Sequence, residues 1–141
     1  MEPTNKKVSL LRIVAATVYD SILMLGVWFL VGSIALGIKF VFTGEVSSLN
    51  PIAGMSLVIL STWLYFAMFW IYGGKTLGMS SWKLRIVSQD GNRITLIQTI
   101  IRFLSNIITI SLAGIPLSFR RINKNNRSLS DLLSKTSIIS D

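Results

Sequence analysis

Four charged side chains lie within or beside long apolar stretches of this 141-residue chain, and they are the first candidates for chemistry: Arg12, Asp20, Arg102 and Asp131. Asp20 lies about two turns into the first apolar run, where a carboxylate is costly unless it is paired, hydrated or protonated. It is therefore either a proton or cation site or a structural partner of another element, and both interpretations stay open. We hypothesise a direct or water-bridged contact between Asp20 and Arg102, whose polar helix face would meet that of Asp20.

The other two charges have simpler interpretations. Arg12 precedes the first apolar run, a place where a guanidinium orients a membrane span and contacts anionic headgroups. Asp131 follows Ser128 by three residues, which is the spacing of a capping box at the start of a helix. The sequence does not decide between this capping role and a functional role for Asp131.

A segment that we call the glycine motif carries Gly74, Lys75, Thr76, Leu77, Gly78 and Met79. It lacks the G-x-x-x-x-G-K-[ST] spacing of a phosphate-binding loop, so nucleotide binding is not expected from it. The chain contains neither His nor Cys. Their absence removes Ser-His-Asp triads, thiolate metal sites and cysteine nucleophiles. We therefore expect no enzymatic activity, no metal and no cofactor.

The composition indicates a membrane protein. Hydrophobic residues make up 51% of the chain and charged residues only 14%, against about 25% charged in a typical soluble domain. The net charge of +8 suits basic residues that flank membrane spans and contact the anionic headgroups of the bilayer. Nucleic acid is not an expected partner, because a chain embedded in lipid lacks a free basic face.

Two apolar runs, residues 13–36 and 52–72, are long enough to cross a bilayer as helices, which takes about 20 residues. Asn50 and Pro51 are a typical helix start, and Gly73 and Gly74 end the second run. Small residues in the first run would allow another helix to approach closely: Gly26, Gly32 and Gly37. The distribution of Lys and Arg places the N-terminus and residues 73–95 in the cytoplasm and residues 37–51 outside.

The third hydrophobic region, residues 95–119, has one polar and one apolar helical face. A single crossing would place the cations of the basic tail, residues 120–141, outside the cell, so an amphipathic or re-entrant arrangement is favoured over a crossing. Residues 82–96 predict a short cytoplasmic β-hairpin around Asp90 and Gly91. The predicted fold is a single all-α membrane domain over residues 1–141, with two transmembrane helices, this third region and the hairpin.

These residues resemble the RDD family of bacterial multi-pass membrane proteins over almost the whole chain. The resemblance is carried by the segments Leu11-Arg12, Tyr19-Asp20, the glycine motif, Leu84-Arg85-Ile86-Val87, Arg102-Phe103-Leu104 and Ser130-Asp131-Leu132-Leu133. The one Arg and two Asp that name the family would be Arg12, Asp20 and Asp131. Family members often carry an aromatic residue or His before the tail Asp, where this chain has Ser130. The resemblance implies a location in the bacterial inner membrane, and transport of small solutes or ions has been suggested for the family.

Two functions remain open at this point. The first is a small-solute or cation/proton transporter with Asp20 as its ion or proton site. Three hydrophobic regions are too few for a transport path in one copy, so this function implies a homo-oligomer. The alternative is a membrane-embedded adaptor or regulator that binds another membrane protein.

Overall fold

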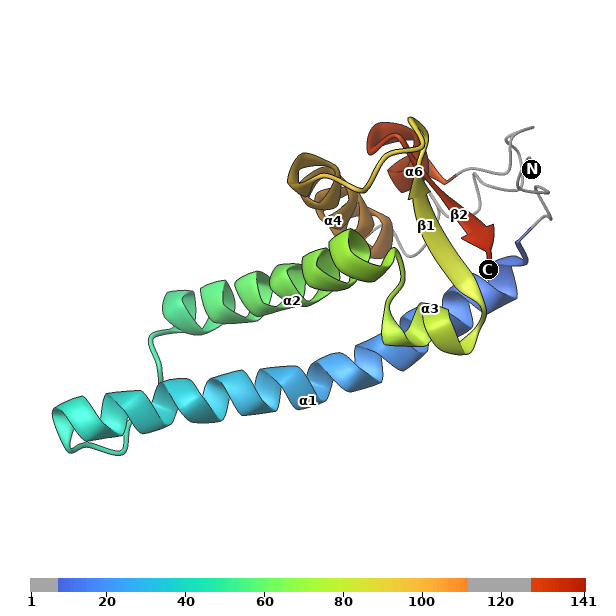
Figure 1. The fold of residues 1–141 in the computed structure, drawn as a ribbon. Helices are drawn as coiled ribbons and strands as arrows, with labels where there is room; N and C mark the ends of the chain where they lie inside the picture. Colours follow the sequence, from blue (N-terminus) through green and yellow to red (C-terminus); the bar gives the residue numbers. More distant parts are fainter. Residues whose placement is uncertain (1–7, 112–127) are drawn as a thin grey trace.

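Two long helices form the frame of the molecule in the computed structural model, which describes residues 8–111 and 128–141. Helix α1 (Leu10–Thr43) and helix α2 (Pro51–Gly73) run in opposite directions and are joined by a short connection at one end (Figure 1). Both helices are long and apolar enough to cross a membrane, and most of their large apolar side chains are exposed. They are the two candidate membrane spans that the sequence predicted at residues 13–36 and 52–72.

The shorter elements gather at the opposite end of this frame, where α1 begins and α2 ends (Figure 1). We call them the head: helix α3 (Leu77–Ser81), strand β1 (Leu84–Ser88), helix α4 (Leu96–Ser111), helix α6 (Leu129–Leu133) and strand β2 (Thr136–Ser140). Two small apolar clusters hold the head against the spans, one containing Ile13, Ala16 and Leu84 and the other Trp70 and Ile86. Full burial of a side chain such as Leu84 stabilises the fold by about 1.5–3 kcal/mol.

The ends of the long helices follow the residue types found there. The Asn50 side chain accepts a hydrogen bond from the Ile52 N–H at 2.9 Å, and Pro51 occupies the first turn of α2. Gly74 ends α2 with φ +65°, a left-handed conformation that glycine adopts without steric cost. The predicted start and end of this span are therefore confirmed. Between the helices, the Trp28 indole N–H donates to the Thr62 hydroxyl at 2.8 Å.

The small sheet differs from the predicted hairpin at residues 82–96. Strand β1 pairs antiparallel with β2, with Leu84 opposite Ser140 and Ser88 opposite Thr136. Gly91 does turn the chain, with φ +72°, but residues 92–95 do not return as a strand. A two-stranded hairpin alone is marginal in water. The tail supplies the better partner, because β2 also brings Ile138 against both apolar clusters of the head.

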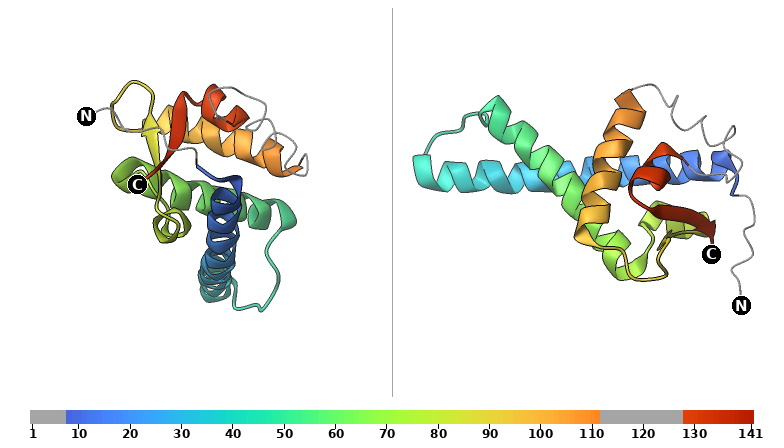
Figure 2. Two further views of the ribbon diagram at one scale, coloured as in Figure 1. Left: turned by 90° about the vertical axis from the view of Figure 1, so that its right-hand side faces the viewer. Right: turned by 90° about the horizontal axis from the view of Figure 1, so that it is seen from above.

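The burial pattern of helix α4 is the reverse of that of a surface helix in a soluble protein. Its polar face is buried, through Thr99, Arg102, Ser105 and Thr109. Its apolar face is exposed, through Leu96, Ile97, Ile100, Leu104, Ile107 and Ile108. Figure 2 shows α4 crossing the end of α2, with α6 and β2 beside it. The predicted amphipathic region is thus a short apolar helix over residues 96–111, and residues 112–119 lie outside the described part of the chain.

The fold prediction is confirmed in its main features. The structure is mostly helical, with two long apolar helices, one shorter apolar helix and a small two-stranded antiparallel sheet. The correction concerns the source of the second strand. Because β2 comes from residues 136–140, residues 128–141 of the basic tail are part of the head, and its residues 120–127 lie outside the described part of the chain.

Candidate functional site

Asp20 is 5% exposed where α1 meets α3, and two donors from the segment after α2 hold its carboxylate. The Thr76 hydroxyl donates to Oδ2, and the Gly78 backbone N–H donates to Oδ1 at 2.9 Å. Thr76 is also the N-cap of α3, where its hydroxyl oxygen accepts from the Met79 N–H at 3.1 Å. N–H groups in the first turn of a helix have no partner inside the helix. Asp20 satisfies one of them and so connects α1 to α3.

The two glycines of the glycine motif are required by close packing. A Cβ atom at Gly78 would collide with the carbonyl oxygen of Ala16 and lie 2.8 Å from Cγ of Asp20. A Cβ atom at Gly74 would lie 3.0 Å from the carbonyl oxygen of Ile86, whose own N–H donates to the Gly74 carbonyl at 2.6 Å. The motif therefore positions α3 against α1 and β1 against the end of α2.

The contact with Gly78 also determines where Asp20 lies along the two long helices. Gly78 follows the last residue of α2 by five positions. Asp20 is therefore level with a segment outside α2, and the part of α1 beyond it, residues 21–43, is as long as the 23 residues of α2. The sequence suggested a position two turns inside the span, because hydropathy alone cannot show how far α1 extends past its neighbour.

Arg102 and Asp131 form a buried ion pair between α4 and α6. Their side chains are 3% and 1% exposed, and Nη1 of Arg102 lies 2.7 Å from Oδ1 of Asp131. The same nitrogen donates to the Thr136 hydroxyl at 2.5 Å, and the guanidinium lies over the Trp70 ring, 5.6 Å from its centroid. Asp131 and Ser128 form a capping box at the start of α6. The capping role predicted for Asp131 is confirmed, and its ion pair adds a second role.

The hypothesised direct contact between Asp20 and Arg102 is wrong. Asp20 faces α3, whereas Arg102 faces the tail, because α4 packs chiefly on α2 and α6. The polar stripe of α4 did indicate a buried polar partner. The sequence could not identify Asp131 as that partner, because it lies 29 residues further along the chain.

Arg12 stands apart from both buried charges. It lies in the first turn of α1 with an exposed side chain, and it forms no ion pair with any residue in the described ranges. Its position leaves headgroup contact as the interpretation, and that stays a prediction. Among the described residues, the arginine that carries a buried charge is Arg102.

A third group of charges lies at the end of β2, and sequence reasoning missed it. The Asp141 carboxylate pairs with the Lys75 ammonium through Oδ2, and its Oδ1 lies 3.8 Å from Nε of Arg85. The Asp141 N–H donates to the Lys83 carbonyl at 2.9 Å. The hydrogen bond from Lys75 lowers the pKa of Asp141 below the usual carboxyl value, and the Arg85 charge acts in the same direction. These groups meet only because β2 pairs with β1.

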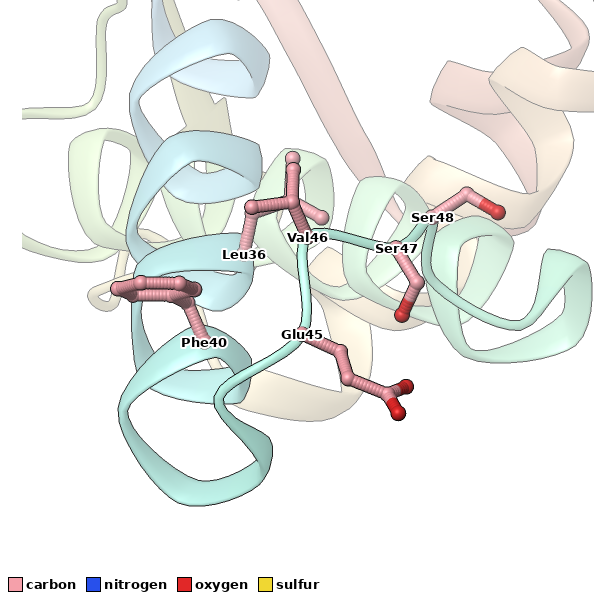
Figure 3. Close-up of a pocket in the computed structure, with 6 residues that line it drawn as sticks. All are labelled: Leu36, Phe40, Glu45, Val46, Ser47 and Ser48. Carbon is pink, nitrogen blue, oxygen red and sulfur yellow. The ribbon is translucent and has the colours of Figure 1, made fainter.

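An open cavity of about 250 Å³ lies at the far end of the frame, by the connection between the spans (Figure 3). It is lined by Leu36, Phe40, Glu45, Val46, Ser47 and Ser48. Neither Asp20 nor any residue of the ion pairs described above lines this cavity. In the described part of the chain, no three acidic, His or Cys side chains come together as a metal site would need.

Comparison with known proteins identifies the family. The model of the RDD family matches residues 9–135, which include Arg12, Asp20, the glycine motif and Asp131. No curated protein and no solved structure matches the chain. The resemblance that the sequence motifs indicated is confirmed. With its two candidate membrane spans, the chain is a membrane protein that belongs to the RDD family.

Proposed function

We propose that this protein is a membrane-embedded adaptor or regulator of another membrane protein, and not an enzyme. One observation supports this most directly: the two buried carboxylates of the described residues are already engaged within the chain. Asp20 accepts from Thr76 and Gly78, and Asp131 from Arg102 and Ser128. Carboxylates held in this way stabilise the head. Because these carboxylates have a structural role, the proposed function depends on the surfaces of the protein.

The surface that we assign to the partner is the side of α1 turned away from α2. Trp28 faces α2, where it bonds to Thr62, and a residue two positions away lies on roughly the opposite helix face. Gly26 is such a residue, and Gly37 lies three turns further along the same face. A Cβ atom at either glycine would meet nothing within 4 Å. Small residues allow two membrane helices to approach closely.

We place the protein in the bacterial inner membrane with its N-terminus and head in the cytoplasm. The head carries Lys75, Lys83 and Arg85, and Arg12 lies in the first turn of α1 at the same end of the frame. The other end of the frame carries one cation and one anion, Lys39 and Glu45. Positive charge near the spans favours the cytoplasmic side.

Single cysteines test the adaptor proposal, because the chain has none of its own. We expect Gly26→Cys and Gly37→Cys, labelled with a photoreactive maleimide in native membranes, to give the same discrete crosslinked product with one other protein. Leu60→Cys on α2, also exposed, is the control and should give none. Products that contain only two copies of this chain would contradict the adaptor proposal and favour an oligomer.

The second candidate is an oligomeric cation/proton or small-solute transporter with Asp20 as the ion or proton site. One observation favours it. The Tyr65 hydroxyl on α2 lies beside the Asp20 carboxylate and interacts with it, so the second span also contributes a polar group to this site. A proton or cation bound at Asp20 would therefore lie between groups of both spans.

Proton flux in proteoliposomes under an imposed pH gradient separates the two functions. The adaptor proposal predicts no dependence of flux on added Na⁺, K⁺ or Li⁺ from folded, inserted protein. Cation-dependent flux that is lost in Asp20→Asn and kept in Thr109→Val would establish the transporter instead. The Thr109 variant removes a buried hydroxyl that donates to the Ser105 carbonyl and not to Asp20, so it controls for damage to the fold.

A further inference from the structure

Lys75 and Arg85 come together where α2 passes into the head. Lys75 is the second residue after the end of α2, and Arg85 reaches back from β1 to the same point. The Arg85 side chain passes beside Gly74, with Cγ 3.4 Å from where a glycine Cβ would stand. Lys83 lies two residues before Arg85 and adds a third basic residue to this edge of the head.

One acidic group lies between these cations. The Asp141 carboxylate contacts the ammonium of Lys75 and lies 3.8 Å from Nε of Arg85. Its side chain and that of Lys75 are each 33% exposed, and that of Arg85 is 46% exposed. Among the described residues, one side-chain carboxylate therefore faces two cations that are in contact with solvent.

The depth of this cluster relative to α2 indicates which anion it would meet in a membrane. A helix of 23 residues is about 34 Å long, enough to cover a hydrocarbon core of about 30 Å. Two residues beyond its end, Lys75 reaches the layer of lipid headgroups. Lys and Arg are the usual partners of phosphate oxygens, Arg through its fork of N–H groups and Lys as a point charge.

We propose that Lys75 and Arg85 form a binding site for the phosphate of an anionic membrane lipid, and that the Asp141 carboxylate occupies this site when no headgroup is bound. The carboxylate is an internal competitor, since it offers the same kind of oxygen to the same donors. Asp141 follows the last residue of β2, so its side chain can leave the site while residues 136–140 stay paired with β1. The proposal rests on the membrane placement above and is independent of the choice between adaptor and transporter.

Lipid binding to the full-length protein in neutral detergent tests this site. The probes are short-chain phosphatidylglycerol, phosphatidylcholine with the same acyl chains, and inorganic phosphate, and bound lipid is counted by native mass spectrometry. We expect phosphatidylglycerol to bind more tightly than phosphatidylcholine. Each of Lys75→Gln and Arg85→Gln should weaken it by about fivefold, the effect of one basic residue near an anionic surface.

Three further variants make the test specific. Asp141→Asn removes the competitor, so it should tighten phosphatidylglycerol binding. Lys75→Arg keeps the charge and should retain binding. Lys39→Gln is the matched control, because Lys39 lies at the far end of α1, where its ammonium donates to the Ser48 carbonyl at 2.6 Å.

Several results would overturn the site. They are equal binding of the two lipids, a Lys39→Gln effect as large as that of Lys75→Gln, or weaker binding in Asp141→Asn. Displacement of the lipid by inorganic phosphate at comparable concentration would show that the site takes the free anion and would overturn the assignment to lipid. These measurements involve no flux and no partner protein, so their failure is distinguishable from failure of the adaptor proposal.

Discussion

Gly78 is a residue at which α1 and α3 approach closely, and the carboxylate that joins them lies beside it. We predict that Gly78→Ala destabilises the protein by about 1–3 kcal/mol or more, because the added methyl group meets the Ala16 carbonyl oxygen and Asp20. Gly26→Ala is the control. It has open space for a methyl group, and it replaces a poor helix former with a good one. Unfolding in mixed detergent micelles measures both, and equal stability of the two variants would contradict this account of Gly78.

The buried charges make a second prediction at the same scale. Breaking a buried ion pair by removing one partner costs about 3–5 kcal/mol. Arg102→Met and Asp131→Asn should each be strongly destabilising, and the double variant should lose less than the sum. By contrast, Asp20→Asn and Arg102→Met should be additive within about 0.5 kcal/mol, because the two residues do not share a contact. Coupling between Asp20 and Arg102, measured in the same unfolding experiment, would contradict the separation of the two sites.

At single positions the sequence was informative wherever the partner is close along the chain. Asn50 and the pair Ser128 and Asp131 form their caps through residues two or three positions away. Asp20 was recognised as a polar group that needs partners. Its donors lie 56 and 58 residues away along the chain. Residue type therefore predicted that Asp20 needs hydrogen-bond donors, but spacing could not identify them.

Among the elements, α4 carries the least common arrangement, with its polar face inward and its apolar face outward. We predict that this apolar face contacts lipid. Spin labels at Ile97→Cys and Leu104→Cys should be more accessible to oxygen, which partitions into lipid, than to a water-soluble paramagnetic reagent. A label at Ser81→Cys on exposed α3 should show the opposite preference. Labels at Ile97 and Leu104 that favour the water-soluble reagent would show that α4 lies outside the bilayer.

The attachment of β2 to the end of α2 depends on pH through Asp141. Its pKa is lowered in the folded protein, chiefly by the hydrogen bond from Lys75. A carboxyl group whose pKa is lower in the folded than in the unfolded state contributes stability above the unfolded pKa. That contribution is lost as the pH falls through the lowered value. The contribution of the Asp141 ion pair is therefore complete at neutral pH and lost in acid, whereas the pairing of β2 with β1 does not depend on this group.

An NMR titration of the Asp141 carboxyl carbon checks this prediction. We expect its pKa to rise toward the ordinary value in Lys75→Gln, with a smaller rise in Arg85→Gln, because Arg85 acts only through its charge at 3.8 Å. Lys39→Gln should leave it unchanged. A pKa that does not respond to Lys75→Gln would contradict the ion pair.

Predictability also differs between elements for a physical reason. The spans are specified by continuous apolar runs, which any window of the sequence shows. Strand β1 was expected, but its partner was not, since pairing between residues 84 and 140 closes a loop of more than 50 residues that no local signal records. The turn at Gly91 was predicted correctly. The strand predicted to follow it does not form, and β1 pairs with β2 instead.

For the whole molecule, the pairing of β1 with β2 has a consequence for membrane topology. Residues 84–88 follow the second span, and residues 136–140 follow α4. Paired strands must lie on the same side of a membrane, so the chain between them cannot make one net crossing. The same pairing keeps the described end of the tail, with Lys135, on the same side as the cations that follow α2, as the positive-inside tendency favours. The structure therefore supports the re-entrant or interfacial arrangement over a third crossing.

We predict that a membrane-impermeant maleimide reacts with Ser81→Cys and Ser140→Cys from the same side of the membrane, and with Ser47→Cys from the other. Ser47 lies in the connection between α1 and α2, Ser81 ends α3 and Ser140 ends β2. Labelling of intact cells and of inverted membrane vesicles distinguishes the two sides. Ser81→Cys and Ser47→Cys serve as references for the head and for the far end of the frame. Reaction of Ser140→Cys together with Ser47→Cys would require a third crossing, which is incompatible with a sheet made of β1 and β2.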